Sequence, residues 1–420
     1  MTTSRSTLLA GLVALLFAPV RTVTAQPQVR ELPVVQAALD ALRADNTWTL
    51  TQQAEICEIP APPFGEAARG EAVRQRFLAL GLRQVRIDAE GNVIGERPGS
   101  GAGPRVALTA HLDTVFPDST DVRVTRQGTR LIGPGIGDDC RGLAVILAVA
   151  RALDRARVST PGTIVFVATV GEEGPGNLRG VRHLFDQRSA GQLNGFISVD
   201  GTGLGLTSRA IGSHRYRVTF QGPGGHSFGE FGMPNPIHAL GRAIAELSEI
   251  VVPLSPRTTF SVGMVQGGTS VNSIAMSSAM DIDFRSERQE ILDQLDSRLR
   301  RIVRDAVAAE KARWPASQVG LEAVITDIGR RPASSQSDDA PIVQAALGAA
   351  RRLGFTPSIS ASSTDANYPM SLGVPAVTID GGGEGRGAHS LSESYEDGLE
   401  GWKGPQWALL LSLELVGLKR

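Results

Sequence analysis

A histidine and an aspartate lie at the end of a run of apolar residues in the first third of the chain. Residues 106–115 read Val-Ala-Leu-Thr-Ala-His-Leu-Asp-Thr-Val, which is typical of a buried strand with polar residues at its C-terminal edge. Open α/β sheets place their sites at that edge. Because side chains two positions apart share one side of a strand, His111 and Asp113 face the same way. A metal-bound histidine needs a partner for its second ring nitrogen, and we expect the Asp113 carboxylate to supply it.

Two acids stand in a glycine-rich loop farther along the chain. Residues 133–142 read Gly-Pro-Gly-Ile-Gly-Asp-Asp-Cys-Arg-Gly, and a strongly apolar helix is predicted over residues 143–153. Glycines let such a loop hold Asp138 or Asp139 in a constrained geometry at the helix N-terminus. An N-cap would account for one of these acids but not for both.

Two more predicted strands end in acids. Residues 163–170 lead to Glu172 and Glu173, and residues 196–199 lead to Asp200. Clustered carboxylates repel one another and are costly to bury unless a cation compensates them. The convergence of these acids with the histidine edge therefore predicts a metal site.

A second histidine, His389, lies in the glycine-rich stretch 381–390, which follows a predicted strand over residues 376–379. Two histidines and three or four carboxylates suit a pair of divalent ions, above all Zn²⁺, with one carboxylate as the bridge. Two ions about 3.5 to 4 Å apart would activate a water molecule and polarise a carbonyl oxygen. The residues therefore indicate a two-metal hydrolase.

In their order along the chain, these motifs resemble the M20 family of co-catalytic zinc metallopeptidases. This family includes tripeptidase T, dipeptidases, carboxypeptidase G and acetylornithine or succinyl-diaminopimelate deacylases. The resemblance implies two Zn²⁺ ions, with Co²⁺ or Mn²⁺ as substitutes. The metal ligands that it implies are His111, Asp139, Glu173, Asp200 and His389.

The resemblance also implies a role for each side chain around the two ions. His111 and Asp200 would hold one ion, Glu173 and His389 would hold the other, and Asp139 would be the bridging carboxylate. Asp113 would orient His111. Glu172 would be the general base, which takes a proton from the bridging water and passes it to the leaving nitrogen.

The fold class that we predict is α/β, a catalytic domain with a mixed sheet sandwiched by helices. Residues 213–329 interrupt it with a strand, helix, strand, strand, helix, strand order, which is typical of a small α+β domain of the ferredoxin-like kind. We expect a signal peptide over residues 1–25 and the two parts of the catalytic domain over residues 26–212 and 330–420.

The inserted segment resembles the lid and dimerisation domain of the family. By this resemblance, His226 reaches the active site of a partner subunit and helps to stabilise the oxyanion. Asn272 and Arg285 resemble groups that hold the carboxylate or backbone of the substrate. From the residues alone, Arg285 could equally form a surface salt bridge, and Asn272 could belong to a turn. We expect a homodimer through residues 213–329.

Composition and charge restrict the partners. A charged fraction of 20% and a formal charge of -1 give no reason to expect nucleic acid or an anionic membrane as partner. The N-terminal 25 residues have Arg5, an apolar run over 8–20 and small residues before Gln26, so we expect export to a periplasmic or extracellular space. Export would permit a disulfide, but Cys57 and Cys140 are expected as buried free thiols.

The reaction that we predict is hydrolysis of a peptide or amide bond of a small peptide or N-acyl amino acid. Within the family resemblance, an aspartate at position 200 favours an aminopeptidase, dipeptidase or tripeptidase. A carboxypeptidase or N-acyl amino acid deacylase is the alternative, since Arg285 could bind a free carboxylate. A non-catalytic binding protein would be expected to lack Glu172 or a metal ligand, and a thiol hydrolase using Cys140 would need a histidine base beside it.

Overall fold

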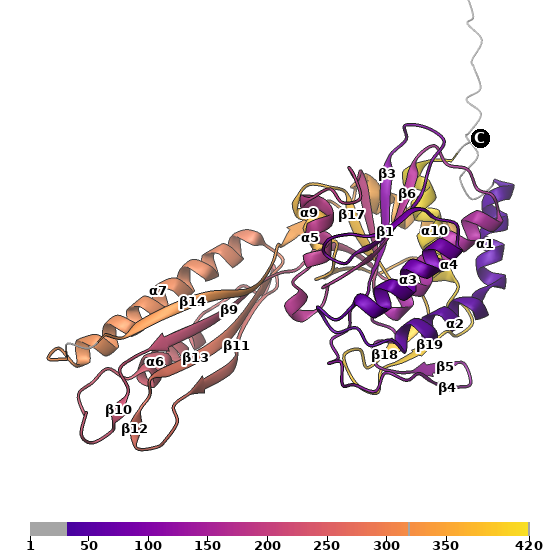
Figure 1. The fold of residues 1–420 in the computed structure, drawn as a ribbon. Helices are drawn as coiled ribbons and strands as arrows, with labels where there is room; N and C mark the ends of the chain where they lie inside the picture. Colours follow the sequence, from indigo (N-terminus) through magenta and orange to yellow (C-terminus); the bar gives the residue numbers. More distant parts are fainter. Residues whose placement is uncertain (1–31, 318–319, 419–420) are drawn as a thin grey trace, which may run out of the picture.

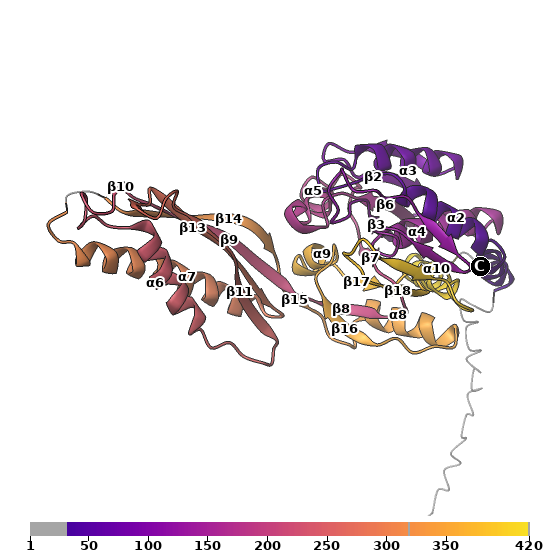
Figure 2. The same ribbon diagram turned by 90° about the horizontal axis from the view of Figure 1, so that it is seen from below.

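The computed structural model of the protein describes residues 32–317 and 320–418. The signal peptide predicted over residues 1–25 lies outside this part of the chain. Among the described helices, none is long and apolar enough to cross a membrane. Figures 1 and 2 show a large domain and a smaller, elongated one that extends from one side of it.

A mixed sheet of nine strands forms the centre of the large domain. Its middle strands β6, β3, β7 and β17 run parallel to one another, and the pairs β1–β2, β2–β6, β17–β8 and β8–β15 are antiparallel. In spatial order the strands are β1 (Arg83–Ile87), β2 (Val93–Arg97), β6 (Thr163–Thr169), β3 (Arg105–His111), β7 (Gly195–Val199), β17 (Ala376–Ile379), β8 (Leu206–Ala210) and β15 (Ser334–Ser335), with β16 (Ile359–Ser362) beside β8. The parallel middle strands are apolar and buried on both faces, as such strands usually are.

Helices cover both faces of this sheet. The main apolar core lies between one face and a layer formed by α1 (Pro33–Ala44), α2 (Asn46–Cys57), α3 (Ala67–Ala79), α4 (Cys140–Arg155), α8 (Pro341–Arg352) and α10 (Lys403–Val416). A smaller core lies on the other face under α5 (Arg179–Asp186) and α9 (Asn367–Ser371). The predicted α/β fold class is thereby confirmed, and its parallel strands direct their C-terminal ends to one edge.

The small domain is a four-stranded antiparallel sheet with two helices on one face. Its chain order is β9 (Gly212–Gln221), α6 (Pro236–Ser248), β11 (Thr258–Gly267), β13 (Ser277–Ser286), α7 (Gln289–Arg313) and β14 (Glu322–Arg331), and its strand order is β11-β13-β9-β14. Alternate residues of β9 are buried against the helices, which explains the alternating pattern of its sequence. This is the ferredoxin-like arrangement that was predicted. A short pair, β10 (Gly225–His226) and β12 (Ser273–Ile274), lies at the far end of the domain (Figure 1).

A further four-stranded sheet supports two loops of the large domain. It joins β18 (Glu384–Arg386), β19 (Ser394–Glu396), β5 (Arg130–Ile132) and β4 (Thr125–Gln127), so that chain segments far apart in the sequence pair with each other. A single turn of 3-10 helix, η2 (Gly174–Gly176), follows β6. The loops that carry Asp138 and His389 both adjoin this sheet.

Candidate metal centre

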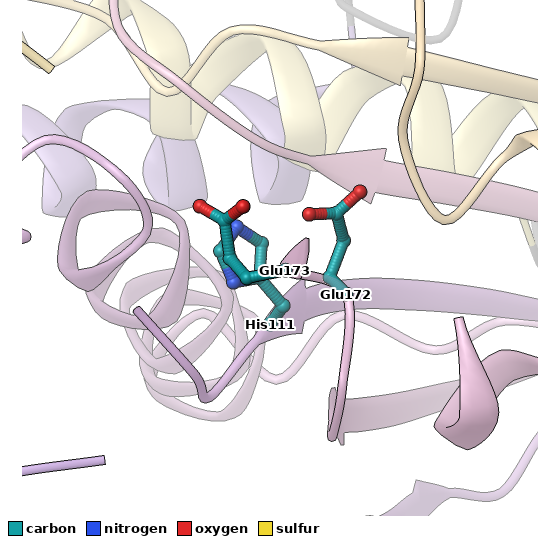
Figure 3. Close-up of side chains that lie close together, drawn as sticks. All are labelled: His111, Glu172 and Glu173. Atoms are coloured by element: carbon teal, nitrogen blue, oxygen red, sulfur yellow. The ribbon is translucent and has the colours of Figure 1, made fainter. Parts of the chain in front are cut away.

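The proposed site residues converge at the C-terminal edge of the large sheet. His111 is the last residue of β3, Glu172 and Glu173 follow β6, and Asp200 follows β7 directly. One ligand atom each of His111, Glu172 and Glu173 lie within 4.8 Å of one another. Figure 3 shows the Glu173 carboxylate next to the His111 ring, with Glu172 on the same loop.

Asp138 lies between the two histidines. Its Oδ1 is 3.0 Å from Nε2 of His111, and its Oδ2 is 3.1 Å from Nε2 of His389. Asp200 Oδ1 lies 3.9 Å from the same nitrogen of His111, and Glu173 Oε1 lies 3.0 Å from that of His389. Two groups of possible ligands result, and they share Asp138.

This donor set fits a pair of divalent metal ions. Each group offers one imidazole nitrogen and carboxylate oxygens, which are ligands that Zn²⁺ accepts. His389 has a φ of 64°, a left-handed conformation that is uncommon outside glycine. Each group also holds two carboxylates, whose negative charges are costly to bury together unless a cation compensates them.

Asp139, which the sequence analysis assigned as the bridge, has a different position. It is the N-cap of α4: its Oδ1 accepts the backbone N–H of Gly142 at 2.9 Å, and its Oδ2 accepts that of His111 at 3.0 Å. Both carboxylate oxygens are therefore engaged by backbone, and a Cβ on Gly142 would meet them at 2.3 and 2.4 Å. The structure thus places Asp138, and not Asp139, between the two histidines, because Asp139 caps the helix.

Asp113 also acts on different atoms from those predicted. The ring Nδ1 of His111 donates to the backbone carbonyl of Asp113 at 2.9 Å, whereas the Asp113 carboxylate is 3.8 Å away. That carboxylate accepts the backbone N–H groups of Glu172 at 3.0 Å and Glu173 at 2.7 Å. Asp113 thus orients His111 through its main chain, and its side chain fixes the loop of the two glutamates.

The pKa values of the cluster reflect crowded charges in a buried place. Burial and the neighbouring Glu172 raise the pKa of Glu173 to about 7. A hydrogen bond to Asp138 raises the pKa of His389 to about 9. Burial acts to raise the pKa of Asp138, but hydrogen bonds from His111 and His389 outweigh it and lower that pKa. At neutral pH, His389 and part of Glu173 therefore hold protons that a metal ion would displace, whereas Asp138 is ionised.

Arg331, the last residue of β14, forms a buried ion pair with Glu172. Its Nη1 donates to Oε1 of Glu172 at 2.9 Å and to Oγ of Ser363 at 3.1 Å, and its Nη2 donates to the backbone carbonyl of Glu172. Each side chain of the ion pair is only 6% exposed. This arginine was not predicted from the sequence, because only the return of the chain from the small domain brings it to the site.

Glu393 holds the loop that presents Asp138. Its carboxylate accepts the backbone N–H groups of Gly135 at 2.9 Å, Gly137 at 2.8 Å and Asp138 at 3.0 Å. Glu393 is buried. Its place four residues after His389 in a predicted site loop is the one signal in the sequence that could have identified it.

A cavity of about 650 Å³ opens at the candidate metal centre. Its lining includes Asp138, Glu172, Glu173, Asp200, Arg215, Arg285, Arg331 and His389. Arg285 donates from Nε to Asp283 at 2.7 Å, so the predicted substrate-binding arginine lies both at the cavity and in a surface ion pair.

His226 and Asn272 do not line this cavity. Both are exposed and lie beside each other, because Ser227 donates its backbone N–H to the carbonyl of Asn272 at 3.0 Å. They belong to the β10–β12 end of the small domain, away from the large domain of the same chain (Figure 1).

The fold and the site together define an α/β protein with a candidate two-metal centre and an inserted small domain. Residues 107–401 match the model of the peptidase family M20/M25/M40. The chain belongs to this family, and is a hydrolase of its peptidase and amidohydrolase kind.

Curated relatives and solved structures agree with the family. Carboxypeptidase G2 of Pseudomonas sp. is 26% identical over 89% of this chain and 90% of its own, and acetylornithine deacetylase of Myxococcus xanthus is 27% identical over 86% and 92%. The fold is shared with the aminopeptidase PepT of Bacillus cereus, with a TM-score of 0.70 and 20% identity over 90% of this chain and 99% of that one. A dinuclear metal-binding peptidase of the M20 family from Bacillus subtilis has a TM-score of 0.63 and 19% identity over 89% and 99%.

Proposed function

We propose that the protein is an exported exopeptidase for small peptides, of the aminopeptidase, dipeptidase or tripeptidase type, with two Zn²⁺ ions at the candidate metal centre. One observation carries this proposal: two ligand groups share Asp138, and Glu172 lies beside them in a cavity large enough for a small peptide. Co²⁺ or Mn²⁺ would serve as substitutes.

His111 and Asp200 would hold one ion, Glu173 and His389 the other, and Asp138 both. When bound, the ions would make a water molecule more acidic and polarise the carbonyl of the scissile bond. The nearness of each ligand atom to the others, within 4.8 Å in each group, supports this assignment.

Glu172 would take a proton from the attacking water and pass it to the leaving nitrogen. Arg331 holds Oε1 of Glu172, so Oε2 is the oxygen that would receive the proton. The backbone N–H of Glu172 donates to the Asp113 carboxylate, and this hydrogen bond fixes the position of Glu172 beside Glu173, the proposed metal ligand. This anchoring supports Glu172 as the base, because a general base must be held within hydrogen-bond reach of the proton that it takes.

A carboxypeptidase or an N-acyl amino acid deacylase is the second candidate. Three arginines line the cavity, Arg215, Arg285 and Arg331, and a guanidinium group suits a free carboxylate. Asp200, by family resemblance, favours the aminopeptidase type. The two candidates differ in the terminus of the substrate that must be free.

The test is activity of the zinc-loaded protein, without residues 1–25, on di- and tripeptides that are free, N-acetylated or C-amidated. Cleavage of C-amidated but not N-acetylated peptides supports the aminopeptidase type, and the opposite pattern moves the protein to the second candidate. Glu172→Ala is the control, and full activity of this variant would refute the assignment of the base.

Export and dimer formation are part of the same proposal. The N-terminal segment supports export, and cleavage before Gln26 on secretion would be read by N-terminal sequencing.

Exposed apolar side chains of the small domain support a homodimer through residues 213–329; they include Phe228, Phe231, Met264, Val265 and Val271. In a dimer, His226 could reach the cavity of a second copy. A monomer by light scattering at micromolar concentration would contradict this part.

A further inference from the structure

The two cysteines of the chain lie at the meeting point of two helices. Cys57 is the last residue of α2, and Cys140 is the first residue of α4. Both are fully buried and belong to one small apolar cluster with Leu131, Ile136 and Tyr395. Neither has a part in the proposed reaction.

Both cysteines are free thiols in the structure, as expected from the sequence, and both contact one short segment of the chain. Cys57 Sγ donates to the carbonyl of Pro134 at 3.4 Å, and Cys140 donates its backbone N–H to the carbonyl of Gly135 at 3.2 Å. These contacts to two consecutive residues, within one apolar cluster, place the two cysteines beside each other. The chain contains two cysteines in all, so one intrachain pairing is possible.

We propose that Cys57 and Cys140 form a disulfide when the chain folds in an oxidising environment. Each thiol loses its proton and the sulfur atoms bond to each other, while a low-molecular-weight disulfide such as oxidised glutathione takes up the two electrons and becomes two thiols. The bond would close a long loop and tie the start of α4 to α2. Because Asp138 and Asp139 directly precede Cys140, the bond would also fix the loop that presents them.

The fold itself should favour this bond. A disulfide that stabilises the native state forms more readily in the folded chain than in the unfolded one, by the same free energy. From the usual stabilisation by a native disulfide, we expect the effective concentration of the two thiols to be about 30- to 900-fold higher in the folded chain than in urea. The melting temperature should be about 4 to 7 °C higher for the oxidised protein than for the reduced one.

The experiment refolds the metal-free protein from urea in buffers of oxidised and reduced glutathione, since buried thiols exchange only while the chain is open. Free thiols are then alkylated in denaturant and counted by intact mass, and a non-reducing digest identifies the linked peptides. The expected result is a protein with no free thiol and the Cys57–Cys140 cross-linked peptide. The effective concentration of the two thiols, taken from the oxidised fraction at each glutathione ratio, should be about 30- to 900-fold higher in the folded chain than in urea. The readout does not depend on activity, so failure here is distinct from failure of the proposed function.

Cys57→Ser and Cys140→Ser are the controls, and each should leave one alkylated thiol and abolish the redox dependence of the melting temperature. Two free thiols after refolding, glutathione adducts in place of the cross-link, or equal effective concentrations in the folded and unfolded chain would each overturn the proposal.

Discussion

Replacing Arg331 by methionine should affect both stability and catalysis, because its guanidinium is the buried partner of Glu172. The change keeps most of the side-chain length but removes the charge and three hydrogen bonds. Breaking a buried ion pair by removing one partner typically costs about 3–5 kcal/mol, since the other charge is left uncompensated. For a domain of this size, the melting temperature should fall by about 5 to 9 °C.

The catalytic effect of Arg331→Met should appear in kcat. The guanidinium holds Oε1 and the backbone carbonyl of Glu172, so without it the carboxylate is no longer fixed in one orientation beside the ligand groups. The assay is kcat and KM on a susceptible dipeptide, together with thermal melts. A loss of packing alone would lower the melting temperature but leave kcat of the folded, zinc-loaded enzyme unchanged.

Arg330→Met is the matched control for Arg331→Met. Arg330 precedes Arg331 on β14 and pairs with Asp327, but both side chains of that pair are 45% exposed. Exposed pairs contribute about 0–1 kcal/mol, so this variant should melt within a few degrees of the parent. Equal effects of the two substitutions on the melting temperature and on kcat would refute the reasoning about the buried pair.

Three further predictions concern the loops, the protons and the arginine of the site. Glu393→Gln should lower stability by about 1.5–3 kcal/mol and weaken metal binding, measured by chemical denaturation and zinc titration, whereas Glu396→Gln at the end of the following strand β19 should change neither. In the metal-free protein, the pKa of His389, raised to about 9, should add stability that is complete below pH 6.5 and is lost as the pH rises through 9; melts at pH 6, 7.5 and 9 that show no decline would contradict this. Arg285→Met should lower kcat/KM about 10- to 100-fold for substrates with a free carboxylate, through KM, while Arg217→Met, which removes a similar surface pair with Asp281, should not.

Most of the fold could be predicted from the sequence because hydrophobic periodicity is a local signal. The apolar runs that became β3, β6 and β7 are buried on both faces, and the alternation in β9 marks a sheet with one covered face. The positions of His111 and Asp200 followed from the ends of such strands, since parallel strands share an edge.

Two adjacent aspartates could not be told apart from the sequence, because either of them could cap the helix that follows. Asp138 and Asp139 are equivalent in type, and only the helix start distinguishes them: the second acid caps α4 and the first one is free. The spacing of Asp139 to Gly142 contained this signal, because a glycine there makes room for the capping carboxylate.

The remaining features of the site depend on contacts between residues that are far apart in the sequence. Arg331 comes to Glu172 from β14, far along the chain, and no local pattern distinguishes it from Arg330. The Asp113 carboxylate faces backbone N–H groups rather than an imidazole, and this depends on how two loops pack. Such pairings are properties of the tertiary structure.

The most direct measurement is the zinc content of the purified protein and of two single-site variants, by mass spectrometry of the metal after loading and desalting. If Asp138 joins two metal sites, the parent chain should hold two ions, and Asp138→Asn should hold one or fewer. Asp139→Asn should be less stable, because it loses a capping oxygen, but should still hold two ions when folded. Two ions in Asp138→Asn, with loss of one in Asp139→Asn, would contradict the account of the site.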